Sequence, residues 1–151
     1  MGRIAAVLLL AGGLMACSST DRVAAYLDEV ERITQRLTDE SAIALPPGTT
    51  PTREGVAGVV AARRHALTDL ASLDPPAEMA AEHLALVTVV GDLVTAAEAF
   101  LTETASLSRT EFLEALSASA QIDVLAARVA EACDVMRVRA RTLGHVVSLE
   151  C

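Results

Sequence analysis

The sequence predicts an all-α protein: an antiparallel four-helix bundle with a C-terminal tail pinned by a disulfide. Apolar residues recur at spacings of three and four, as they do along one face of a helix, and alternating patterns typical of strands are almost absent. Two proline-containing stretches and one helix-capping motif divide the chain into four helical segments. Each segment carries a single apolar stripe, and short connections favour antiparallel packing of neighbouring helices.

The first two helices are expected over about residues 20–41 and 51–73. Their apolar stripes are Val23, Leu27, Val30, Ile33 and Leu37 in the first, and Val56, Val59, Val60, Leu67 and Leu70 in the second. Prolines and a glycine between the two helices indicate a loop. Thr50 followed by Pro51 suits an N-cap and a first helical residue. Asp74-Pro75-Pro76 ends the second helix, because proline cannot continue it.

The third helix is expected from about 76 to 105, and Ser108 with Glu111 forms a capping box that opens the fourth. We expect the fourth helix to run unbroken to Gly144, because two apolar seams repeat every seven residues over four heptads. One seam is Phe112, Ser119, Ala126, Cys133 and Ala140, and the other is Ala115, Ile122, Val129, Met136 and Leu143. In the tail after Gly144, Val147, Leu149 and Cys151 share one side.

The N-terminal segment predicts export rather than a folded element. Arg3 precedes eleven almost wholly apolar residues, 4–14, which are too few to span a bilayer but suit a signal peptide. Leu14-Met15-Ala16-Cys17 then resembles the lipobox of bacterial lipoproteins. The resemblance implies that a diacylglycerol is attached to the Cys17 thiol and that cleavage makes Cys17 the first mature residue. A plain secretory signal and an uncleaved helix are the alternatives.

The chain is thus expected to have three parts: a signal peptide at 1–16, a lipidated cysteine and short tether at 17–20, and a helical domain at 21–151. The acyl chains on Cys17 suffice as an anchor, so the domain needs no membrane-binding face of its own. The expected location is the cell membrane or outer membrane, facing the periplasm or the exterior. The Leu73-Asp74-Pro75-Pro76 turn, with Glu78 and His83, also resembles uncharacterised helical lipoproteins of bacteria, which implies no activity.

Charge and composition exclude several classes of function. The formal charge of the chain is −8, and loss of Arg3 with the signal peptide would change it to −9. This balance argues against nucleic acid as a partner, because phosphate binding needs clustered basic residues. The chain has one tyrosine, two phenylalanines and no tryptophan, which disfavours stacking platforms and aromatic cages.

Cys133 and Cys151 are predicted to form a structural disulfide. An exported chain meets an oxidising compartment, where paired cysteines usually bridge, and lipidation of Cys17 leaves these two. The seven residues after Gly144, when extended, are long enough to span the length of helix between Cys133 and Gly144, so Cys151 can reach Cys133. Two free thiols or an intermolecular bridge are the alternatives.

His83 and the late arginines are the remaining candidate sites. His83 lies on the apolar face of the third helix, where we expect a core-edge histidine bonded to a neighbouring side chain; a ligand or metal contact is the alternative. A shared site with His65, Asp69 and Glu82 is disfavoured because His65 lies off its helix's apolar stripe. Arg137 and Arg141, with Arg139, complement the helix dipole or form a partner-binding patch.

These observations together predict a lipid-anchored envelope lipoprotein that acts as a helical protein-interaction or scaffolding module. No known catalytic, metal-binding or phosphate-binding motif occurs in the sequence, so we expect no enzymatic activity, no cofactor and no metal. The expected partners are the membrane, through the lipid on Cys17, and a second envelope protein. A small-ligand or metal-binding bundle that uses His83 is the alternative function.

Overall fold

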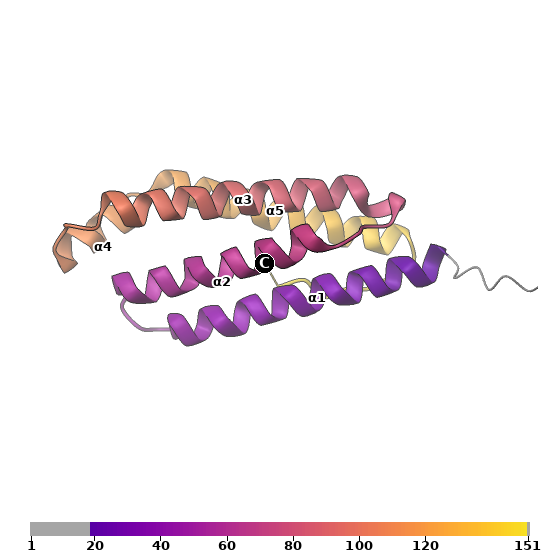
Figure 1. Ribbon diagram of the computed structural model, residues 1–151, viewed down its shortest axis with the longest axis horizontal. Helices are drawn as coiled ribbons and strands as arrows, with labels where there is room; N and C mark the ends of the chain where they lie inside the picture. The colour runs from indigo at the N-terminus through magenta and orange to yellow at the C-terminus, as the bar shows by residue number, and fades with distance from the viewer. Residues whose placement is uncertain (1–18, 151) are drawn as a thin grey trace, which may run out of the picture.

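The computed structural model describes residues 19–150, which form an all-α helical bundle as predicted (Figure 1). Within that range lie five α-helices and one short 3-10 helix, with no strand. The elements are α1 (Ser19–Ala44), α2 (Arg53–Ser72), η1 (Ala77–Met79), α3 (Ala80–Glu103), α4 (Arg109–Ser117) and α5 (Ala120–Thr142). The predictions made for Cys17 and Cys151 concern positions outside the described residues.

The long helices pack in chain order, α1 on α2, α2 on α3 and α3 on α5, and they lie side by side in Figure 1. α1 and α5 do not pack closely against each other. The apolar faces of all four meet in one core cluster whose largest fully buried members are Leu27, Val30, Ile33, Met79, Leu86, Cys133 and Met136. The predicted stripes of α1 and α3 therefore face the core, as periodicity requires.

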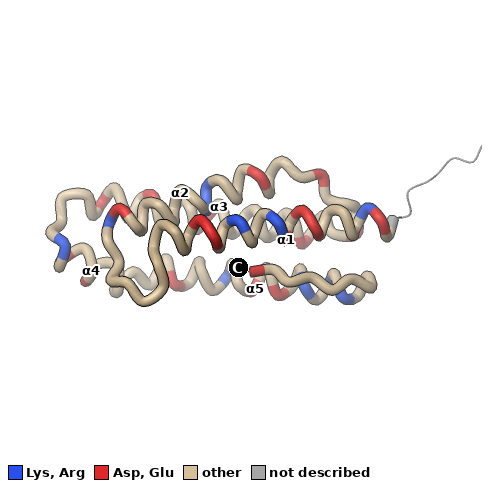
Figure 2. Tube along the Cα trace, turned by 90° about the horizontal axis from the view of Figure 1, so that it is seen from below, with Lys and Arg blue, Asp and Glu red and all other residues tan. Residues whose placement is uncertain are grey.

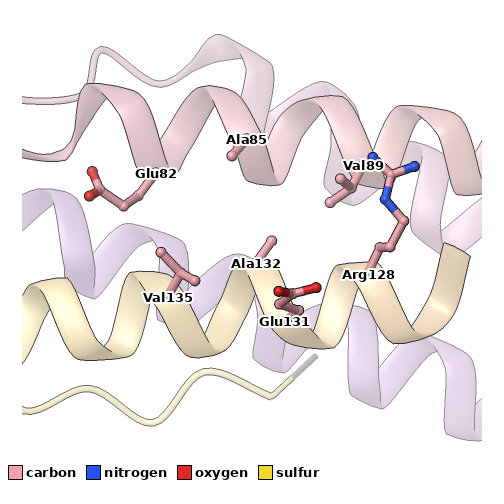
Figure 3. Close-up of a pocket in the computed structure, with 7 residues that line it drawn as sticks. All are labelled: Glu82, Ala85, Val89, Arg128, Glu131, Ala132 and Val135. Carbon is pink, nitrogen blue, oxygen red and sulfur yellow. The ribbon is translucent and has the colours of Figure 1, made fainter.

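The C-terminal tail covers the core where α1 and α5 do not meet. Gly144 has a φ of +87°, the left-handed conformation that ends many helices and that glycine adopts freely. The chain then reverses and runs back along α5 (Figures 1 and 3). Leu149 is 5% exposed and Val147 packs on the core, whereas Val146 points to solvent. The predicted alternation of the tail is confirmed for Val147 and Leu149.

The start of α2 differs from the prediction by two residues. Thr52, not Thr50, is the N-cap, because its hydroxyl accepts a hydrogen bond from the Gly55 amide at 3.0 Å. Pro51 consequently lies just outside the helix and not at its first position. Both threonines suit an N-cap chemically, and the sequence pattern alone did not separate them.

The prediction of an unbroken fourth helix was wrong. α4 begins at the predicted capping box, in which Ser108 and Glu111 bond each other's backbone, but it ends at Ser117, and α5 begins at Ala120. The Phe112 side chain explains why the short helix is held across the end of the bundle. Its ring is buried, lies 5.7 Å from the Phe100 ring and is covered by the Arg53 guanidinium at 4.7 Å.

Arg53 also fixes the chain between α3 and α4. Its guanidinium donates hydrogen bonds to the carbonyl oxygens of Thr104 and of Leu107, the latter at 2.9 Å. Anchoring Phe112 in this way turns α4 away from the axis of α5. As a result Ala126, a predicted seam residue, is exposed, and its neighbour Leu125 is buried instead.

Acidic and basic residues alternate along the outer faces of α1 and α5 (Figure 2). Several form ion pairs within one helix, including Arg32 with Glu29 and Arg137 with Asp134. Such exposed pairs add little stability each. Among residues 19–150, one segment, Ala77–Glu103, is long and apolar enough to cross a membrane, with a mean hydropathy of 1.8. Seven of the side chains within α3 are buried against neighbouring helices, as in the central helix of a packed bundle.

Candidate functional site

A groove lies between α3 and α5 (Figure 3). It encloses about 240 Å³ and is lined by Glu82, Ala85, Val89, Arg128, Glu131, Ala132 and Val135. Its central residues are small or aliphatic, with Ala85 facing Ala132 across the groove (Figure 3). Glu82 lies at one end, and Arg128 lies at the other with Glu131 beside it, so that the groove is apolar in the middle and charged at both ends.

Exposed valines extend this apolar surface along α5. Val124, Val135 and Val138 are 59%, 50% and 58% exposed, although valine is a residue that proteins usually bury. Their spacings of eleven and fourteen residues place them on one stripe of the helix. Val135 and Val138 are neighbours on this stripe, whereas Arg128 and Glu131 separate them from Val124. Exposed apolar side chains beside an apolar groove are typical of a surface that binds a partner. Sequence analysis missed this stripe because it followed the heptad seam, which lies on another face.

Charged side chains around the groove are already paired. Arg128 lies 3.8 Å from Asp92, and Arg139 lies 3.8 Å from Glu82. The Arg139 Nε also donates a hydrogen bond of 2.9 Å to the Glu78 carbonyl oxygen, which ties α5 to η1. These contacts link α5 to α3 and to η1 on either side of the groove.

The late arginines of α5 divide between two faces of the helix. Arg137 pairs with Asp134 on its own helix at 2.6 Å, whereas Arg139 faces η1 and α3. Arg141 is exposed near the end of α5, where its charge complements the helix dipole. Arg137 and Arg141 are four residues apart and therefore lie on one face of α5, whereas Arg139 lies on another face.

His83 lies at the core edge and is hydrogen bonded to a neighbouring side chain, as expected from the sequence. It is 9% exposed, and its Nδ1 lies 3.0 Å from the Tyr26 hydroxyl on α1. The two rings meet edge to face, with centroids 5.8 Å apart. Burial, together with the nearby Glu82 charge, raises the pKa of Tyr26, so the hydroxyl stays protonated. The pair joins α1 to α3.

His65 and Asp69, which a site shared with His83 would require, contact α1 and not His83. His65 is exposed and lies 3.5 Å from Glu40, while Asp69 pairs with Arg36. Nowhere between residues 19 and 150 do three or more histidine, cysteine, aspartate or glutamate side chains assemble as a metal site would require. The alternative of a metal held through His83 would show as stoichiometric metal in the purified protein that His83→Ala loses.

The folding stability of the protein is expected to fall with acid because of His83. Burial lowers the pKa of His83 below its ordinary value of 6.5, so that the unfolded chain binds a proton more readily than the folded protein. The stability contributed by neutral His83 is therefore fully present above the pKa of the unfolded chain. It is lost as the pH falls from that pKa through the lower pKa of the folded protein. We expect the Tm to drop between about pH 7 and pH 5, and His83→Gln to reduce the drop.

The exposed His65 provides the control for this measurement. His65→Gln should leave most of the drop in Tm intact, since its imidazole is not in the core. An equal drop in native protein and His83→Gln would show that other groups govern the acid sensitivity.

Comparison with known proteins gives no relative: no family model, no curated protein and no solved structure matches the chain.

Proposed function

We propose that the protein is a lipid-anchored lipoprotein of the bacterial cell envelope whose helical domain binds a partner protein through the α3–α5 groove. The observation that supports this proposal most directly is an apolar groove with charged ends that lies beside the exposed side chains of Val135 and Val138. An amphipathic helix would fit: its apolar face would cover Ala85, Ala132 and Val135, with a basic residue near Glu82 and an acidic one near Arg128. The lipobox-like sequence at Cys17 supports the anchor.

The architecture that we propose is an antiparallel four-helix bundle of α1, α2, α3 and α5, closed by the tail. Two observations support a Cys133–Cys151 disulfide within it. Cys133 is fully buried, at the centre of the core. Leu149, two residues before Cys151, is buried in the same core cluster as Cys133.

Capture of a partner from intact envelopes should depend on the groove. Val135→Asp places a charge in the apolar centre of the groove, and we expect it to reduce the amount of the specifically captured protein at least about tenfold. The measurement is a quantitative pull-down with full-length protein, followed by mass spectrometry.

Leu84→Asp is the matched control, because Leu84 is a 66% exposed apolar residue of α3 that does not line the groove. Both variants change exposed positions and should melt like the native protein. Equal capture by native protein and by Val135→Asp would contradict a partner at this groove.

A further inference from the structure

A second cavity lies further along α3, toward the end of the bundle that carries α4. It encloses about 240 Å³ and is lined by Leu45, Val56, Val59, Val60, Arg63, Leu93, Ala97, Phe100, Leu116 and Ile122. Leu116 lies in the last turn of α4 and Ile122 in the first turn of α5, so these two lining residues flank the break between the helices. The break that the heptad pattern did not predict therefore borders an apolar cavity at this end of the bundle.

Arg63 is the sole charged residue among those that line this cavity. It lies on α2 one turn after Val59 and is half-buried, and burial lowers its pKa. No acidic side chain lines the cavity, and no charged neighbour offsets the effect of burial on Arg63. Within residues 19–150, Arg63 forms neither a hydrogen bond nor an ion pair.

The lack of a partner for Arg63 contrasts with the other arginines of the bundle. Arg53, Arg64 and Arg139, which are also on helices, each bind a carboxylate or a carbonyl oxygen. The unpaired Arg109 and Arg141 are exposed, so water solvates them. Burying a guanidinium lowers the stability of the folded protein unless the group is paired. The chain has more carboxylates than basic side chains, yet none of them pairs with Arg63 within residues 19–150.

We propose that this cavity binds a single-chain amphiphile, with its hydrocarbon chain among the apolar residues and its anionic oxygen head group on Arg63. Planar guanidinium groups bind carboxylates and phosphates through two parallel hydrogen bonds, and they do so most strongly where water is excluded. A cavity of about 150 Å³ holds the six carbons of benzene, so this one has room for roughly ten. A medium-chain carboxylic acid is the simplest molecule of this class. The site is separate from the α3–α5 groove.

The test is calorimetric titration of the full chain carrying Cys17→Ser, so that no detergent is needed to compete for the cavity. Sodium decanoate, 1-decanol and decylammonium share one chain and differ in head-group charge. We expect decanoate to bind with a stoichiometry of one and at least about tenfold more tightly than the other two. Decyl phosphate in a parallel titration distinguishes a phosphate from a carboxylate head group, and saturable binding of either anion supports the site.

Two variants separate the head-group contact from the cavity. Arg63→Gln should weaken decanoate binding at least about tenfold and remove its advantage over decanol, whereas Arg64→Gln, whose guanidinium pairs with Glu98 outside the cavity, should not. Ala97→Leu fills the cavity from α3 and should abolish binding of every chain. Equal affinities for decanoate and decanol, unchanged decanoate binding in Arg63→Gln, or binding that survives Ala97→Leu would each overturn the proposal.

Discussion

Changing Cys17 to serine is expected to move the protein from the membrane fraction to the soluble fraction. The reason is that we propose the lipid on the Cys17 thiol as the anchor, and each buried methylene group of an acyl chain contributes about 0.8 kcal/mol to membrane binding. Intact-mass analysis of membrane-extracted native protein should show an acylated chain that begins at residue 17. The mass identifies the modification, and fractionation of the variant shows that it anchors the protein.

Ser18→Ala is the control for this experiment, because it alters the neighbouring residue and leaves the Cys17 thiol in place. It should remain with the membrane. Membrane association that persists in Cys17→Ser would instead point to a span or to a binding surface. The apolar segment Ala77–Glu103 would then be the first place to look.

Changing Cys151 to serine is expected to lower the Tm by roughly 10 °C. Closure of a loop of about 18 residues contributes about 3 kcal/mol in the chain-entropy model, a large part of the 5–15 kcal/mol that is typical for a domain. Cys151 is the better position to change, because Cys133 is fully buried and its replacement would also disturb packing around Met136. Melting of the native protein and the variant, each without reductant, gives the difference.

Ser148→Ala, an exposed change in the same tail, should melt like the native protein. Non-reducing peptide mapping should recover the peptides of Cys133 and Cys151 as one linked species. Two alkylatable thiols in protein taken directly from the envelope would refute the bridge. A linked species with an unchanged Tm would leave the bridge without a structural role.

Sequence patterns predicted the features of the helices that depend on residues close together in the chain. The Ser108–Glu111 capping box, the glycine at 144 and the apolar stripe of α1 depend on residues a few positions apart, and all three were found. The heptad from Phe112 onward failed because burial of Phe112 beside Phe100 and Arg53 is a tertiary effect that outweighs helix continuity.

The sequence could not predict which side chains of different helices contact each other. Tyr26 and His83 are 57 residues apart, and periodicity places each on a core-facing stripe without pairing them. Arg63 could have been noticed, because it lies four residues after Val59 and four before Leu67, on the apolar face of its helix. Only the structure shows that the residues around it leave a cavity and no counter-ion.

The absence of close packing between α1 and α5 gives this bundle one seam that can open. The tail residues Val147 and Leu149 cover that seam, so their contacts set the free energy of opening. α3 is covered by long helices on two sides, whereas α1 packs closely on α2 alone. Amide protons of α1 should therefore exchange with solvent as one cooperative unit, ahead of those in α3, each time the seam separates.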